Sequence, residues 1–236
     1  MKKPEIIPAI LPTDFEVLKE KISFVKNAVK TIQIDVCDGQ FTPQPSWPYR
    51  KHDDSFEKII SQEEGLPGWK DVNFEIDLMV NKPEEKVDDW VNVGASRIIL
   101  HAESKGDVGK AIEMLKDIVE IGLALNMDTP VEMIEKFRGY SSAESSNGQT
   151  PIQFVQLMGI DHIGFQGQEF DEKVIGRVKH LRLKYPGLPI SVDGGVSLEN
   201  AQSLFEAGAD RLVVGSAIFN SDNFVEAIAN FKKISV

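Results

Sequence analysis

The sequence predicts an α/β fold, a single-domain (β/α)8 TIM barrel over residues 1–236, and three observations point to this class. Short apolar runs alternate with helix-period segments along the whole chain, as in βαβ units with a parallel sheet. Eight strand and helix pairs in 236 residues leave roughly 30 residues for each pair, which suits a closed barrel better than an open doubly wound sheet. The pattern VGASRIIL at 93–100 returns as AGADRLVV at 207–214, so the chain contains a faint internal repeat.

The eight expected strands are the apolar runs, and helix-start signals follow them. Thr13 and Glu16 have capping-box spacing after the first run, and Ser197 with Glu199 is a weaker version after the seventh. A glycine in each repeat can close a helix before the next strand. The runs are Ile6–Leu11, Thr31–Val36, Asn73–Val80, Arg97–His101, Gly122–Asn126, Phe154–Ile160, Ile190–Val192 and Arg211–Val214.

Two irregular stretches interrupt this alternation of strands and helices. The first, about 41–69, is rich in proline and tryptophan and follows the second strand, so we expect it at the catalytic mouth. The second, 139–150, is polar and follows the fifth helix, which predicts a position on the opposite face. Trp47, Trp69 and Trp90 suggest packing surfaces for a homo-oligomer.

Composition excludes several functional classes. Lys and Arg number 26 against 37 Asp and Glu, so the net charge is 26 − 37 = −11, which argues against nucleic acid as a partner. A single cysteine, Cys37, excludes an intrachain disulfide and a cysteine-based zinc site. The start of the chain lacks a signal-peptide core, and no apolar run reaches about 18 residues. We therefore expect a cytoplasmic protein with no membrane partner.

Acidic side chains stand at the ends of three predicted strands. In a barrel the strand ends meet at one rim, so Asp35, Asp77 and Asp193 should converge there. Gln33 shares one face of its strand with Asp35. An acid in a buried strand costs several kcal/mol unless it is paired, bound to metal or protonated. A simpler interpretation makes Asp35 a loop cap and turns Asp77 outward to a helix, but three acids at one rim favour a functional site.

Glycine-rich loops follow the last three strands. Gly194 and Gly195 follow the seventh, and Gly215 with Ser216 follows the eighth. Their backbone N–H groups can approach an anion closely, and barrels place phosphate at these two loops. The segment 164–168 after the sixth strand could form a third wall or a mobile lid. Alternatively, these glycines only make tight turns.

Eight segments carry motifs of one known family. They are 6–15 IIPAILPTDF, 34–43 IDVCDGQFTP, 77–80 DLMV, 94–104 GASRIILHAES, 126–130 NMDTP, 164–170 GFQGQEF, 191–196 SVDGGV and 207–219 AGADRLVVGSAIF. With them, the chain resembles the ribulose-phosphate 3-epimerase family over nearly its whole length, and the motifs are specific to that family and its sugar-phosphate epimerase relatives.

The resemblance implies an isomerase of carbohydrate metabolism, in the pentose phosphate pathway. It would invert C3 of a ketose phosphate, D-ribulose 5-phosphate to D-xylulose 5-phosphate, through an enediolate. Asp35 and Asp193 stand at the acid/base positions, and a divalent metal would polarise the enediolate oxygens. The implied phosphate and substrate contacts are Gly164, Gly167, Gly194, Gly195, Gly215, Ser216, Met79 and Met158.

The resemblance breaks at the metal ligands. Where the family has two histidines this chain has Gln33 and Asp77, and a strand-one serine that touches substrate is Ala9. The implied ligands Gln33, Asp35, Asp77 and Asp193 offer oxygen, which suits Mg²⁺ or Mn²⁺ better than Zn²⁺. Without metal, clustered carboxylates repel and at least one should hold its proton. A protonated Asp77 could then hydrogen-bond to the enediolate.

Three other functions remain open. One is a catalytically impaired paralogue that binds sugar phosphates, and another is an epimerase for a different ketose phosphate. The third is a decarboxylase or aldolase of the hexulose-phosphate synthase type. That group places a lysine two residues after a strand-three aspartate, where this chain has Met79.

Overall fold

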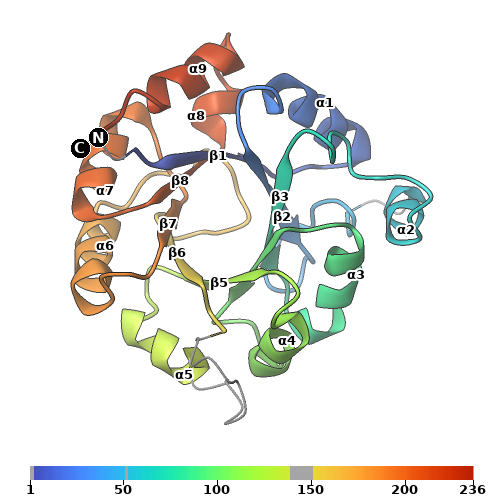
Figure 1. Cartoon of the computed structure of the whole chain (residues 1–236), viewed down its shortest axis with the longest axis horizontal. Coiled ribbons are helices and arrows are strands. Elements are labelled where there is room, and N and C mark those ends of the chain that lie inside the picture. The colour runs from blue at the N-terminus through green and yellow to red at the C-terminus, as the bar shows by residue number, and fades with distance from the viewer. Residues whose placement is uncertain (1–2, 51–52, 139–150, 236) are drawn as a thin grey trace.

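A computed structural model describes residues 3–50, 53–138 and 151–235 and shows eight parallel strands closed into one barrel (Figure 1). Each strand pairs with the next along the chain, and the eighth pairs with the first. The predicted fold class is confirmed. The polar stretch 139–150 lies outside the described residues. The strands are β1 Glu5–Ile10, β2 Thr31–Cys37, β3 Asn73–Met79, β4 Arg97–His101, β5 Glu120–Leu125, β6 Phe154–Met158, β7 Ile190–Asp193 and β8 Arg211–Val214.

Helices form a ring around the barrel (Figure 1). The cap of the first helix is Asp14, whose carboxylate accepts from the backbone N–H of Val17 at 3.0 Å, so the predicted Thr13 cap is one residue early. Gly208 adopts φ 116° and ends α7, as the repeat predicts. The α-helices are α1 Phe15–Val25, α2 Ser55–Ile60, α3 Val87–Asn92, α4 Val108–Leu115, α5 Ile134–Arg138, α6 Lys173–Lys184, α7 Leu198–Ala207, α8 Ser216–Phe219 and α9 Phe224–Phe231; 3-10 turns are η1 Pro83–Glu85 and η2 Val131–Met133.

Alternation along the strands sorts side chains between two environments. Every second residue of a strand points outward, and the apolar residues at these positions pack against the helices and form the main core. The residues between them fill the barrel, where an ion-pair layer lies near the strand starts. In it, Arg97 pairs with Glu5, Glu75 and Glu120, and Arg211 pairs with Glu5 and Glu120. The barrel interior is therefore charged at one end.

The Pro- and Trp-rich stretch 41–69 contains α2 and packs onto the barrel. Trp47 stacks on Phe15 at 5.5 Å between ring centroids and meets Trp90 edge-on at 5.9 Å. Both tryptophans are core residues, with 1% and 0% of their surface exposed. Their predicted role in packing surfaces between subunits is therefore wrong, whereas Trp69 is 60% exposed.

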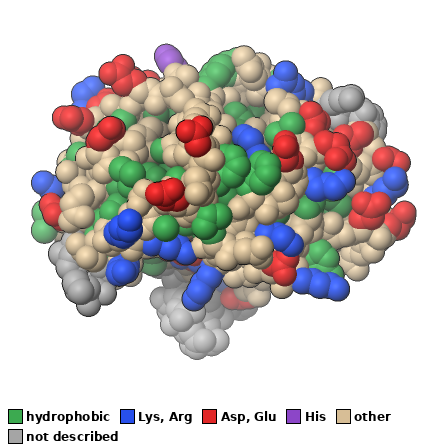
Figure 2. Space-filling model, turned by 90° about the horizontal axis from the view of Figure 1, so that it is seen from above, with side chains coloured by type: hydrophobic (Ala, Val, Ile, Leu, Met, Phe, Trp, Pro, Cys, Tyr) green, Lys and Arg blue, Asp and Glu red, His purple; other side chains and the backbone are tan. Residues whose placement is uncertain are grey.

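The outer surface carries charges of both signs. Figure 2 shows acidic and basic side chains interspersed over one face. Within the described part of the chain, no helix is long and apolar enough to cross a membrane.

Candidate active site

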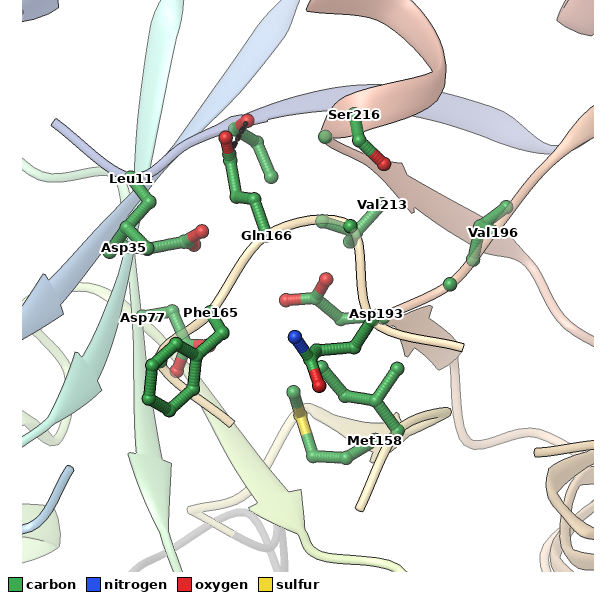
Figure 3. A pocket seen from close by; sticks show the side chains of 18 of the residues that line it. Leu11, Asp35, Asp77, Met158, Phe165, Gln166, Asp193, Val196, Val213 and Ser216 are labelled. Atoms are coloured by element: carbon green, nitrogen blue, oxygen red, sulfur yellow. Dashed lines mark hydrogen bonds between the residues drawn. The ribbon is translucent and has the colours of Figure 1, made fainter. Parts of the chain in front are cut away.

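A pocket opens at the carboxyl ends of the strands, where barrels place their active sites (Figure 3). Strand ends and the loops after β6, β7 and β8 build its wall. Every predicted site residue except Gln33 lines it; Gln33 lies beneath, within the barrel. The lining residues are Ala9, Leu11, Asp35, Asp77, Met79, Met158, Ile160, Gly164, Phe165, Gln166, Gly167, Gln168, Asp193, Gly194, Gly195, Val196, Val213, Gly215 and Ser216.

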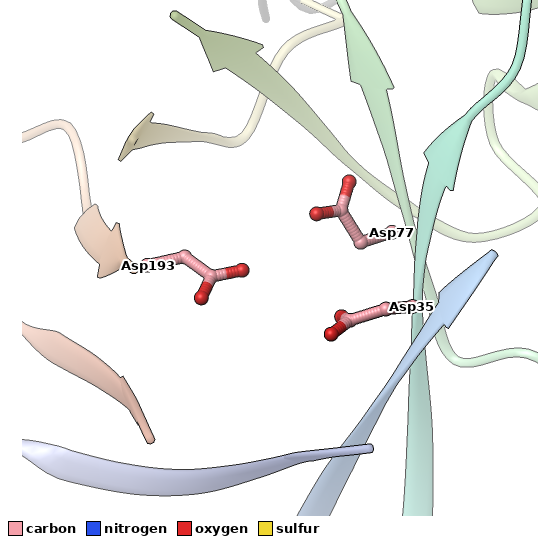
Figure 4. Close-up of side chains that lie close together, drawn as sticks. All are labelled: Asp35, Asp77 and Asp193. Atoms are coloured by element: carbon pink, nitrogen blue, oxygen red, sulfur yellow. The ribbon is translucent and has the colours of Figure 1, made fainter. Parts of the chain in front are cut away.

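Three aspartates converge at the floor of this pocket. Asp35 and Asp77 are register partners on β2 and β3, and Asp193 points toward them from β7 across the barrel (Figure 4). One carboxylate oxygen of each lies within 4.8 Å of the other two. Asp77 is fully buried inside the barrel, which excludes the interpretation that turned it outward to a helix.

Two glutamine amides contact the carboxylates. The Nε2 atom of Gln33 donates to Asp35 Oδ1 at 2.7 Å and to Asp193 Oδ2 at 2.7 Å. The Nε2 atom of Gln156 donates to Asp77 Oδ2 and Asp193 Oδ2, both at 3.2 Å. The sequence prediction omitted Gln156, although its parity with Met158 on β6 places it inside the barrel.

A buried histidine completes the cluster. His101 at the end of β4 places Nε2 3.0 Å from Asp77 Oδ1, and its Nδ1 lies 3.8 Å from Glu103 Oε2. Burial alone would lower the pKa of His101, but the charge and hydrogen bond of Asp77 outweigh it and raise that pKa. Both oxygens of Asp77 therefore face hydrogen-bond donors, the imidazole and the Gln156 amide.

Burial and mutual repulsion shift the titration of the two other aspartates. Burial raises the pKa of Asp35 well above its ordinary value, and the charges of Asp193 and Asp77 raise it further. Burial, together with the charge of Asp77, raises the pKa of Asp193 to about 7, although the Gln33 hydrogen bond opposes the shift. Near neutral pH this pair therefore holds a proton, as an acid and base pair requires.

The cluster also fits a divalent cation. Three carboxylate oxygens from different strands lie close enough together to share one ion. Gln33 Oε1 is buried without a hydrogen-bond partner among the described residues, and a half-turn of the amide would aim it at the same place. Such an all-oxygen set suits Mg²⁺ or Mn²⁺.

The loops after β7 and β8 expose backbone to the pocket. Gly194 and Gly195 have φ of 101° and 67°, values that L side chains rarely adopt. A Cβ at Gly194 would lie 2.7 Å from a carbon of Ile160, so the chain closely approaches the loop after β6. Met79 and Met158 line the pocket beside the carboxylates, and Cys37 is buried with Sγ 3.9 Å from the sulfur of Met79.

A closed parallel barrel with carboxylates and glycine-rich loops at its carboxyl-terminal mouth defines a class: (β/α)8 barrels whose site lies at that end. Within this class, the chain belongs to the ribulose-phosphate 3 epimerase family, whose model matches residues 5–219.

Curated relatives of this family match nearly the full chain. The chloroplastic ribulose-5-phosphate-3-epimerase of Arabidopsis thaliana is 30% identical over 240 residues, covering 98% of this chain and 77% of that protein. Ribulose-phosphate 3-epimerase of Bacillus subtilis is 29% identical over 235 residues, covering 97% and 98%.

Solved structures at low identity share the fold. KGPDC from Streptococcus mutans has a TM-score of 0.71 at 16% identity and covers 98% of this chain and 96% of that one. A 3-hexulose-6-phosphate synthase has a TM-score of 0.68 at 16% identity, covering 98% and 100%. At this identity the likeness shows the barrel and not the reaction.

Proposed function

We propose that the protein is an isomerase that inverts C3 of a ketose phosphate, converting D-ribulose 5-phosphate to D-xylulose 5-phosphate. The observation that carries the proposal is the pair of buried aspartates, Asp35 and Asp193. They come from opposite walls of the pocket, and the pKa of each is raised. Inversion needs such a pair, because one group removes the C3 proton and another returns a proton to the opposite face.

The residues around the pair suit an enediolate. As C3 loses its proton, negative charge develops on the neighbouring oxygens and needs donors in a site shielded from water. The amide nitrogens of Gln33 and Gln156 lie at the carboxylates, and the imidazole of His101, whose pKa is raised by Asp77, lies 3.0 Å from that carboxylate. These groups offset part of the negative charge that three carboxylates impose on an anionic substrate.

A divalent cation fits the same place. The carboxylates of Asp35, Asp77 and Asp193, with Gln33 Oε1 after rotation of the amide, would hold it. When bound, the ion would polarise the ketose carbonyl and offset two of the three carboxylate charges.

The glycine-rich loops suit the phosphate end of the substrate. Gly194, Gly195, Gly215 and Ser216 line the pocket. Backbone N–H groups of such loops can donate to phosphate oxygens without cationic side chains. With the phosphate at these loops, the sugar carbons extend toward the aspartates, and Met79 and Met158 offer apolar contact.

Deuterium exchange tests this function directly. The protein is incubated with D-ribulose 5-phosphate in D₂O, with and without Mn²⁺, and deuterium at C3 is measured by NMR. We expect exchange in the wild type and a loss of about 10²–10⁴-fold in Asp35→Asn and in Asp193→Asn. No exchange under either condition would overturn the proposal.

One observation favours a second candidate, a sugar-phosphate binder without turnover. The side-chain nitrogen of Gln33 donates hydrogen bonds to both Asp35 and Asp193. Both proposed acid/base carboxylates are therefore already engaged by one amide. Calorimetric binding of pentose phosphates with no exchange would favour this function. Exchange with another ketose phosphate alone would instead identify an epimerase of different specificity.

A further inference from the structure

The side chain of Gln166 crosses the mouth of the pocket, from the loop after β6 to the end of β1. Its Nε2 donates to the carbonyl oxygen of Ala9 at 3.3 Å. Figure 3 shows this side chain between Asp35 and Ser216. The same nitrogen lies 3.2 Å from the position that a Cβ would take at Gly215. One amide thus touches the ends of two strands that flank the proposed phosphate loops.

The loop that carries Gln166 is held at both ends by close packing. A Cβ at Gly164 would lie 2.7 Å from Thr42 Cβ, in the segment after β2. A Cβ at Gly195 would lie 2.7 Å from Phe170 Cα. Neither approach leaves room for a larger residue, so the segment between them spans the mouth in a defined place. The position of Gln166 follows from this packing.

The Gln166 amide has a hydrogen-bond donor to spare. A primary amide nitrogen carries two N–H groups. Among the described residues its acceptor is Ala9 O, which leaves the second N–H for an oxygen in the pocket. The described pocket lining contains no Lys or Arg and includes the carboxylates of Asp35, Asp77 and Asp193. A phosphate group there has only uncharged donors to hold it, so each additional N–H contributes to its affinity.

We propose that Gln166 is a specificity-determining residue for the phosphate end of the substrate. Ala9 O fixes the amide, and its second N–H binds a phosphate oxygen beside Gly215. This inference rests on the proposed function, because it places the phosphate of a ketose phosphate at these loops. On the β1 side the lining is otherwise the apolar Leu11 and Ala9 side chains, so Gln166 supplies the polar side chain there.

Binding of phosphate ligands to two variants tests the proposal. Gln166→Leu keeps the approximate size without N–H groups, and Gln166→Glu keeps the shape and adds a negative charge. We expect Kd for inorganic phosphate and for D-ribulose 5-phosphate, measured by calorimetry, to rise roughly 10- to 100-fold in Gln166→Leu and further in Gln166→Glu. The matched control is Gln202→Leu, since Gln202 is exposed on α7 and bonded to Glu206; it should bind as the wild type does.

The outcomes separate this inference from the proposed function. Unchanged or tighter phosphate binding in Gln166→Leu overturns the inference, since the side chain then only covers the mouth. Wild-type protein that shows no C3 exchange, while Gln166→Leu loses phosphate affinity, overturns the proposed function and supports the inference. In an active enzyme, Gln166→Leu should raise KM far more than it lowers kcat. A thermal melt of each variant confirms that it is folded.

Discussion

His101 and Asp77 are in hydrogen-bond contact inside the barrel, where both side chains are fully buried and Nε2 lies 3.0 Å from Oδ1. A buried charge costs several kcal/mol unless a partner offsets it, so each member makes the other tolerable. The pair links β3 to β4 beside the proposed acid/base residues, and the charge of His101 opposes the rise in the pKa of Asp193.

Removing the imidazole should destabilise the protein and shift its pH profile. His101→Ala leaves Asp77 buried without the imidazole that contacts it, so we expect a loss of about 3–5 kcal/mol in urea unfolding. The pKa of Asp193 should rise further, which moves the acidic limb of the activity profile to higher pH. His180→Ala is the control, because His180 is exposed and its pair with Glu132 spans 3.3 Å; about 1 kcal/mol or less is expected. Equal losses in both variants would contradict this account.

Divalent cations should stabilise the fold through the aspartate cluster. An ion that binds only the folded protein at 100 times its Kd adds about 2.7 kcal/mol, or roughly 5–10 °C in Tm for a chain of this size. We expect such a rise with Mn²⁺ and its loss in Asp77→Asn. Replacing Gln33 and Asp77 together by histidine should turn the preference toward Zn²⁺, because imidazole nitrogen suits zinc. If no divalent ion changed the Tm of the wild type, that result would argue against a metal site.

The pKa of Asp193 predicts a stability that falls as pH rises. The carboxyl titrates near 3.8 in the unfolded chain and at about 7 in the folded protein. Between these values the folded protein holds a proton that the unfolded chain has released. The free energy of unfolding therefore falls as pH rises from about 4 to about 7. With chelator present, wild type should lose on the order of 4 kcal/mol relative to Asp193→Asn between pH 4 and 8. Parallel curves for the two proteins would refute the shifted titration.

Much of the fold was predictable because periodicity reports burial. The predicted strands lie within two residues of the observed ones, and Asp35, Asp77 and Asp193 converge because strand ends in a barrel share one rim. Contacts across the barrel were harder to predict. Gln156 sits inside an apolar run. Its bond to Asp193 joins the neighbouring strand β7, and its bond to Asp77 exists only because β6 and β3 face the same closed interior. Thr13 and Asp14 are both good helix caps and are adjacent in the chain. The sequence pattern alone does not distinguish which of the two caps the helix.

The ion-pair layer at the other end of the barrel was also missed. A charged residue at the start of a strand usually marks the point where the strand leaves the solvent. Only its position in the in–out alternation of the strand shows that its side chain points into the barrel. Glu5, Glu75 and Glu120 face Arg97 and Arg211, which leaves three formal negative charges against two positive ones. Burial raises the pKa of Glu75 to about 7, while Arg97 and Arg211 oppose the shift. Glu75 is thus the member of the layer whose charge is least compensated.

Substitutions at Arg97 and Glu75 should therefore change the free energy of unfolding in opposite directions above pH 7. Arg97→Ala removes a partner of three glutamates and should cost roughly 3 kcal/mol or more in urea unfolding. Glu75→Gln leaves two negative charges against two positive ones and keeps an oxygen to accept from Arg97, so stability should change by about 1 kcal/mol or less at pH 6. Above pH 7, where wild-type Glu75 must ionise in the barrel, Glu75→Gln should be the more stable protein. If Glu75→Gln were destabilised as strongly as Arg97→Ala at both pH values, a charged Glu75 would be required by the fold.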